Sequence, residues 1–144
     1  MATRPAPSST SPAAEAWGLI HGLFMASKGR FIAIAQEFDL TPMQMGAVRN
    51  LDPDRPVPMS ELAGSLHCDA SNVTGIVDRL ETRGLVERRG ADHDRRVKML
   101  ALTDEGARVR EALVERMSQP PDQLAALSSS DQRALRDILR RALG

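Results

Sequence analysis

Hydrophobic side chains recur at helical spacing over most of this chain. Between residues 13 and 38 they return at steps of three, four or seven, starting with Trp17 and ending with Phe38, which predicts one long amphipathic helix. The same spacing predicts further helices over residues 41–51, 59–66, 69–83, 103–117 and 128–142.

Polar residues and glycine mark the ends of these predicted helices. Thr41 precedes Pro42, a pair that suits the N-cap and the first helical position. Thr103 and Ser128 are placed to cap the last two helices, and Gly84 stands where a left-handed residue commonly ends a helix. The predicted boundaries therefore rest on local chemistry as well as on hydrophobic spacing.

Short strands and loops separate the helices. Residues 85–88 and 97–102 have the pattern of strands joined by a charged loop at 89–96, and three prolines make residues 52–58 a loop. The predicted fold class is mainly α with a small two-stranded β-wing. A winged helix-turn-helix region, residues 41–102, is flanked by long N- and C-terminal helices, residues 13–38 and 103–144.

Composition predicts a flexible N-terminal tail and argues against a membrane or secreted protein. Residues 1–12 are mostly Pro, Ser, Thr and Ala with one charge, which predicts a flexible tail before a single domain at 13–144. No apolar run is long enough for a membrane helix, and no signal peptide opens the chain. We therefore expect no membrane association and a cytoplasmic protein.

Charge is balanced overall but not locally. The chain has 19 basic and 19 acidic residues, yet the predicted wing is basic. Between residues 83 and 98 the basic side chains are Arg83, Arg88, Arg89, Arg95, Arg96 and Lys98, against Glu87, Asp92 and Asp94. A local positive surplus is suited to DNA phosphates, whereas a solvated charged loop is the plainer interpretation.

The helix predicted over residues 69–83 has a polar outer face. Ser71, Asn72 and Thr74 lie near its start, where side chains can contact base edges or phosphates, and Gly75 would allow close approach of a sugar-phosphate strand. Arg79 lies on the same face, although Asp78 and Arg79 could instead pair with neighbouring residues. The alternative is a structural helical hairpin with a solvated face.

Residues 59–106 resemble the winged-helix core of the MarR family of bacterial transcription regulators. The resemblance rests on three motifs: Glu61-Leu62-Ala63 with Ser71 to Thr74; Val77 to Arg88; and Asp94-Arg95-Arg96 followed by Leu100, Leu102, Thr103 and Gly106. Two departures are Ala91-Asp92-His93 before the wing motif and His67 in place of a common turn glycine. The second predicts a less tight turn.

The resemblance implies a homodimer that binds double-stranded DNA. The terminal helices would form the dimer interface, with contributions from Trp17, Ile20, Phe24, Leu135, Ile138 and Leu139. The helix predicted over residues 69–83 would read the major groove, and the wing would enter the minor groove. Arg96 is then the expected inserted residue and Arg95 a phosphate contact. Asp94 would order the wing tip, while Arg88 and Lys98 complete the basic surface.

Other candidate chemistry is weaker. Trp17 and His21 are candidates for the pocket of an aromatic or amphipathic effector. His21, His67 and His93 show no metal-ligand spacing, so no metal or other cofactor is expected. Cys68 falls in the predicted turn and is interpreted as a small core residue, a reactive thiol being the alternative.

Catalytic motifs are absent from the sequence: it has no nucleophile elbow, phosphate loop or HExxH motif, so an enzyme is not expected. The predicted function is a dimeric, sequence-specific transcriptional regulator, a repressor that binds an inverted repeat and that a small-molecule effector could release. A winged-helix protein-interaction module without DNA binding is the alternative. A basic wing tip distinguishes the two, because a scaffold does not need one.

Overall fold

Helices dominate the computed structural model, which describes residues 11–68 and 70–144. Most of the predicted flexible tail, residues 1–10, lies outside the described residues. The elements are α1 (Pro12–Glu37), α2 (Pro42–Asn50), β1 (Val57–Pro58), α3 (Met59–Leu66), α4 (Ala70–Thr82), β2 (Val86–Gly90), β3 (Lys98–Leu102), α5 (Asp104–Ser118), α6 (Asp122–Ala125) and α7 (Ser129–Leu143).

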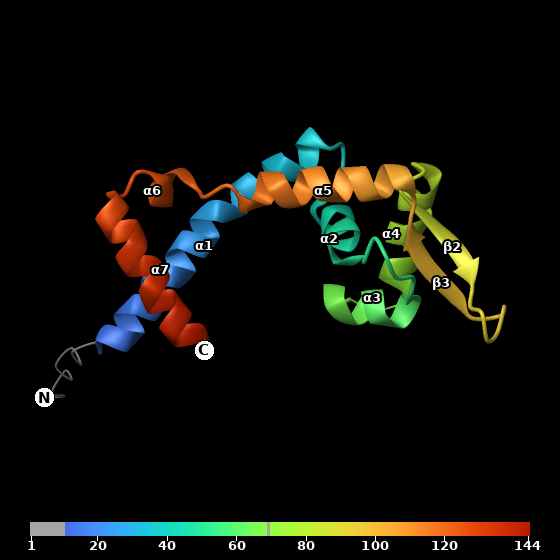
Figure 1. Cartoon of the computed structure of the whole chain (residues 1–144), viewed down its shortest axis with the longest axis horizontal. Coiled ribbons are helices and arrows are strands. Elements are labelled where there is room, and N and C mark those ends of the chain that lie inside the picture. Colours follow the sequence, from blue (N-terminus) through green and yellow to red (C-terminus); the bar gives the residue numbers. More distant parts are fainter. Residues whose placement is uncertain (1–10, 69) are drawn as a thin grey trace, which may run out of the picture.

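The molecule is elongated, with two regions at opposite ends (Figure 1). One region contains α2, α3, α4 and the sheet, and we call it the winged region. The other contains the first half of α1 together with α6 and α7, and we call it the arm. Helix α5 connects the two, and both termini lie at the arm end (Figure 1). None of the described helices is long and apolar enough to cross a membrane.

Helix capping agrees with the predicted boundaries. Thr41 Oγ1 accepts a hydrogen bond from Gln44 N, and Gln44 Oε1 accepts one from Thr41 N, which makes a complete capping box. The predicted caps Thr103 and Ser128 are confirmed, since each side chain accepts a bond from the backbone three residues ahead. Gly84 ends α4 with φ 69°, as a left-handed terminator does.

The sheet has three strands where the sequence predicted two. Its order is β1-β3-β2, all antiparallel, and β1 pairs Val57 with Leu100 and Pro58 with Met99. Proline is tolerated here because β1 is an edge strand, where a missing N–H need not face a neighbour. The proline-rich segment 52–58, predicted as a loop, therefore ends in a strand. Helix α6 was likewise not predicted.

Helix α3 ends at a left-handed residue that is not glycine. His67 caps α3 with φ 52° and ψ 39°, in the left-handed region, and Cys68 N donates to Ala63 O at 3.2 Å. Histidine thus adopts the conformation that glycine would supply. Residue 69 of the turn lies outside the described residues, so the less tight turn stays a prediction. Cys68 packs partly buried against the core, in agreement with its interpretation as a core residue.

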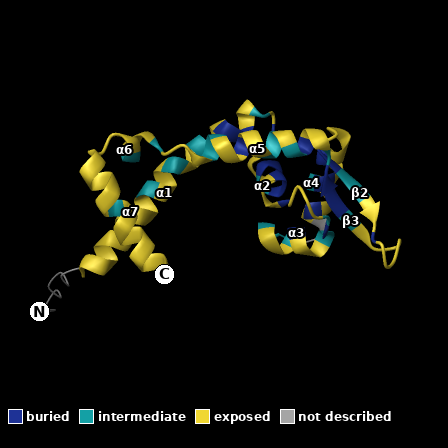
Figure 2. Cartoon of the chain, in the orientation of Figure 1, coloured by how far each residue is buried: buried dark blue, intermediate teal, exposed yellow. Residues whose placement is uncertain are grey.

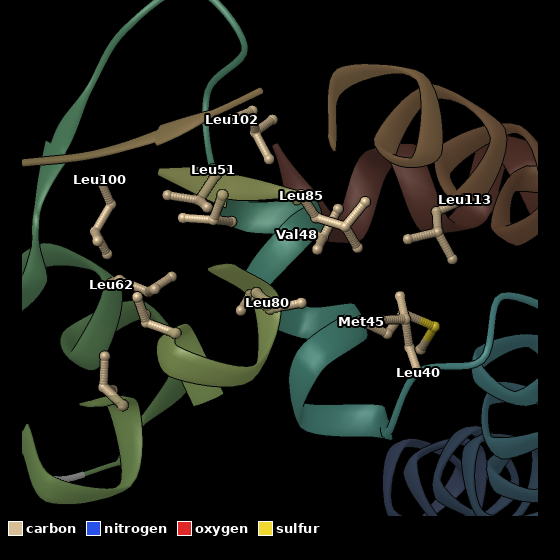
Figure 3. Close-up of a cluster of buried hydrophobic side chains, with 14 of the residues drawn as sticks. Leu40, Met45, Val48, Leu51, Leu62, Leu80, Leu85, Leu100, Leu102 and Leu113 are labelled. Atoms are coloured by element: carbon tan, nitrogen blue, oxygen red, sulfur yellow. The ribbon is translucent and has the colours of Figure 1, made fainter. Parts of the chain in front are cut away.

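The hydrophobic core lies in the winged region (Figure 2). Leu62, Leu80 and Leu100 meet there from α3, α4 and β3, and all are essentially inaccessible to solvent. Figure 3 shows Leu113 of α5 facing Met45 of α2 in the same cluster. The core thus fixes α4 and the wing to a common scaffold.

Candidate nucleic-acid interface

Helix α4 turns one face to the core and the opposite face to solvent. Val73, Val77 and Leu80 are completely buried, which leaves Asn72, Thr74, Gly75, Asp78 and Arg79 exposed. Gly75 has open space where a side chain would begin, with nothing within 4 Å. The side chain of Ser71, predicted as a DNA contact, lies outside the described residues.

A groove runs between α4 and the start of α2. Its volume is about 440 Å³, and it brings together three predicted site residues, Asn72, Gly75 and Arg79. Its other lining residues are Thr41, Met43, Gln44 and Ile76. The polar face of α4 therefore borders a recess rather than a flat surface.

The wing tip is held by a carboxylate. Asp94 Oδ1 accepts a hydrogen bond from Arg96 N at 2.9 Å and lies 3.8 Å from Arg96 Nε. The Arg96 side chain is nonetheless 95% exposed. Asp94 thus orders the backbone of the tip while the adjacent guanidinium extends into solvent.

The hairpin loop of the wing borders another recess, of about 380 Å³. Gly90, Ala91, Asp92, Arg95 and Lys98 line it. A side chain at position 90 would begin 3.2 Å from Arg95 Cα, so glycine allows the two sides of the wing to approach closely. Arg95 and Lys98, predicted separately, therefore share one surface.

Arg88 points back toward α4 instead of outward. Its Nη2 lies 2.5 Å from Asp78 Oδ1 and its Nη1 2.9 Å from Glu81 Oε1, and only 25% of the side chain is exposed. The hydrogen bond to Asp78, with the charge of Glu81, raises the pKa of Arg88 above its usual value. Arg88, predicted as a DNA contact, is therefore engaged within the protein.

A second arginine ties the end of α4 to the end of α1. Arg83 donates to the backbone carbonyls of Phe38 and Asp39, the latter contact being very short and the former 3.2 Å. The sequence analysis counted Arg83 only as part of a basic surplus. No signal in one sequence identifies such a bond, because its partners are main-chain atoms 44 and 45 residues away.

Five of the six predicted dimer residues lie exposed on the arm. Trp17, Ile20 and Phe24 face solvent along α1, as do Ile138 and Leu139 on α7, and Leu135 is half-buried. Leu135 and Leu139 line an apolar groove of about 450 Å³ between α6 and α7. His21, the proposed neighbour of Trp17 in an effector pocket, is also exposed.

Comparisons with known proteins identify the family that the winged region resembles. Residues 40–98 match the family model described as "MarR family". The transcriptional repressor MprA of Escherichia coli is 39% identical over 85 residues, which are 58% of this chain and 48% of the relative. The HTH-type transcriptional repressor MdtR of Bacillus subtilis is 32% identical over 87 residues, 60% of this chain and 56% of the relative.

The fold is also shared with solved structures. Wild-type MarR from E. coli, in its apo form, superposes with a TM-score of 0.78 at 24% identity, covering 89% of this chain and 96% of that one. The protein is thus a winged helix-turn-helix protein of the type that carries long terminal helices. The chain carries a MarR-family region at residues 40–98. It spans about half the length of the two curated relatives.

Proposed function

We propose that this protein is a sequence-specific DNA-binding transcriptional regulator that acts as a homodimer in the cytoplasm. One observation supports this most directly: the ordered wing tip extends Arg96 into solvent beside a helix with an exposed polar face. The chain as a whole is neutral, so a cationic tip is a local feature. Named relatives are transcriptional repressors, and repression is the output proposed here.

Each part of the interface has a proposed role on DNA. Helix α4 enters the major groove, where Asn72 and Thr74 contact base edges and Gly75 allows close approach of the backbone. Arg96 enters the minor groove, since a guanidinium is always charged and more weakly hydrated than an ammonium. Arg95 and Lys98 contact phosphates from their shared recess.

The arm supplies the dimer interface. Large apolar side chains are exposed on both α1 and α7, which signals a contact between protein surfaces, and a twofold pair would bury the same residues on both copies. Two copies of α4 would then read the halves of an inverted repeat about 10 bp apart. An effector pocket at Trp17 and His21 stays a prediction, and because both side chains are exposed, a second copy would have to close it.

Selection from a random duplex library by the full-length protein tests the proposal. We expect enrichment of an inverted repeat with half-sites about one turn apart. Replacing Asn72 or Thr74 with Ala should then weaken binding to the selected duplex, relative to binding to a scrambled duplex, by about 1–3 kcal/mol. Equal losses of affinity for both duplexes would mean that these residues contact only the DNA backbone and do not read its sequence.

The wing is tested separately. Replacing both Arg95 and Arg96 with Ala should lower affinity for every sequence and reduce the slope of log affinity against log salt by about 0.9 for each phosphate that the protein no longer neutralises. Thermal unfolding and dimerisation should not change, because both side chains lie outside the core. An unchanged salt slope would remove the wing from DNA binding and return it to the interpretation as a solvated charged loop. A library without enrichment would favour the winged protein-interaction module instead.

A further inference from the structure

Arg88 occupies an inward position on the wing. Side chains alternate along a strand, so Arg88 lies on the same face of β2 as Val86, which is buried, whereas Glu87 and Arg89 lie on the other face and pair with each other. This alternation is visible in the sequence. It places Arg88 on the face of the sheet where its cross-strand partner Leu100 is buried, and it directs the guanidinium toward α4.

The partners of Arg88 are one turn apart on α4. Asp78 and Glu81 are separated by three residues, a spacing that puts both carboxylates on one helical face. Arg88 uses a different terminal nitrogen for each, at 2.5 and 2.9 Å. One side chain therefore fixes both the distance between strand and helix and the rotation of α4 about its axis.

The two ion pairs of Arg88 leave its guanidinium few free N–H groups with which to bind DNA. Both terminal nitrogens already donate to carboxylates, and the side chain is 25% exposed where Arg96 is 95% exposed. A phosphate would have to displace two ion pairs to bind it. The carboxylates also need this cation, because Asp78 and Glu81 would otherwise present two negative charges beside the proposed DNA surface.

We propose that Arg88 is a positioning residue for DNA recognition. It acts through Asp78 and Glu81 to hold α4 and the wing in one mutual orientation, so that both meet the DNA in register. This inference rests on the proposed function, because it concerns the same interface. It replaces the sequence-based assignment of Arg88 as a direct DNA contact.

Neutralising the two carboxylates tests the proposal, because a positioning role and simple electrostatics predict opposite changes in DNA binding. The double variant Asp78→Asn with Glu81→Gln removes two negative charges near DNA, which by simple electrostatics strengthens binding to any duplex. If Arg88 positions α4, preference for the library-selected duplex over a scrambled one instead falls about fivefold, a size typical of a partly exposed ion pair. A rise in affinity for both duplexes with unchanged preference overturns the proposal.

Arg88→Lys provides a second test that keeps the charge. Lysine cannot span two carboxylates as the guanidinium fork does, so a positioning role predicts reduced preference with an unchanged salt slope. A phosphate contact predicts near wild-type binding for Arg88→Lys, and for Arg88→Ala a slope smaller by about 0.9 with equal losses on both duplexes. Those results overturn the proposal.

Arg89→Ala is the matched control. It removes the same residue type from the adjacent position of β2, but its partner Glu87 lies on the same strand, so preference should be retained. Amide hydrogen exchange without DNA provides an independent readout: the α4 amides of Arg88→Lys should exchange faster than those of the wild type. If the wild type selects no sequence, the proposed function fails, and this exchange measurement still decides whether the bridge holds α4.

Discussion

The winged region and the arm have similar hydrophobic patterns but opposite burial. Leu62 and Leu80 in the winged region are almost fully buried, whereas Trp17 in the arm is 68% exposed. Helices α6 and α7 contain no buried residue, and α1 buries only Ile34 and Ala35, close to the winged region. Periodic spacing shows that a helix has an apolar face, but it does not show whether the same chain covers that face.

This difference shows which region buries its own hydrophobic surface and which does not. The winged region closes its core around α2, α3, α4 and the sheet (Figure 3). The arm leaves its apolar stripe to water, which costs free energy that association with a second copy would recover. We therefore expect substitutions in the winged region to change stability and substitutions in the arm to change assembly.

The largest effect is expected at Gly106, where α5 begins against the winged region. A Cβ there would lie 1.9 Å from Leu85 O, a backbone atom. Gly106→Ala must therefore shift α5 or the segment before β2, and it should lower the free energy of unfolding by about 3 kcal/mol or more. Thermal or denaturant unfolding measures this loss.

Gly75→Ala is the matched control for this experiment. Nothing lies within 4 Å of the added methyl group, and alanine favours helix by about 1 kcal/mol over glycine. The variant should be as stable as the wild type or more so. Equal stability losses at the two glycines would contradict the close packing inferred at Gly106.

In the arm, Phe24→Glu should disrupt assembly. Phe24 is 62% exposed in the single chain, so the charge costs the monomer little, but in a buried interface it would lack a partner. We expect the dimer to weaken by about 2 kcal/mol or more, roughly thirtyfold in dissociation constant. Sedimentation equilibrium at micromolar concentration measures the change.

Met43→Glu is the control that tests whether the loss of any exposed apolar side chain would weaken the dimer. Met43 is also an exposed apolar residue, but it lies on α2 in the winged region. Its replacement should leave the dimer intact. If both variants dissociate equally, or if the wild type is already a monomer, the arm is not the interface.

Local chemistry made much of the fold predictable. Hydrophobic spacing and the caps at Thr41, Thr103 and Ser128 placed the long helices, because these signals act within one turn. Strand β1 was missed because its pairing of Val57 with Leu100 joins residues far apart in sequence. Helix α6, of four residues, is too short to show a hydrophobic period.

The candidate site divides in the same way. Arg96 and Asp94 interact across two residues, so their motif was informative by itself. The partner of Arg88 depends on how β2 packs against α4, and the bonds of Arg83 end on main-chain atoms of another element. A sequence shows which residues are charged, whereas the pairing of charges across elements is decided by packing.

A smaller effect is expected at the turn that leads into α4. His67 has positive φ, a conformation that costs an L-residue about 1–2 kcal/mol, part of which glycine loses again through the entropy of the unfolded chain. His67→Gly should therefore stabilise the protein by about 0.5–1 kcal/mol. His93→Gly, at a wing residue without positive φ, should bring no gain. Destabilisation by His67→Gly would show that the imidazole itself supports the turn.

The smallest effect is expected where the arm meets the winged region, at Glu37 of α1. Arg116 of α5 donates to both of its carboxylate oxygens at 2.9 Å, and these bonds hold the pKa of Glu37 below its usual 4.5. A carboxyl group with a lowered folded-state pKa stabilises the protein above its unfolded pKa and loses this contribution as pH falls through the folded value.

Glu37→Gln should consequently be less stable than the wild type at neutral pH, with a difference that stays constant down to about pH 5 and closes below about pH 4.5. Unfolding curves for both proteins between pH 3 and 7 measure this. Glu111→Gln, in α5 but without an ion pair among the described residues, should show no such closing difference. A gap for Glu37→Gln that persists at pH 3 would mean that the side chain acts through packing, and the junction would then depend on shape instead of charge.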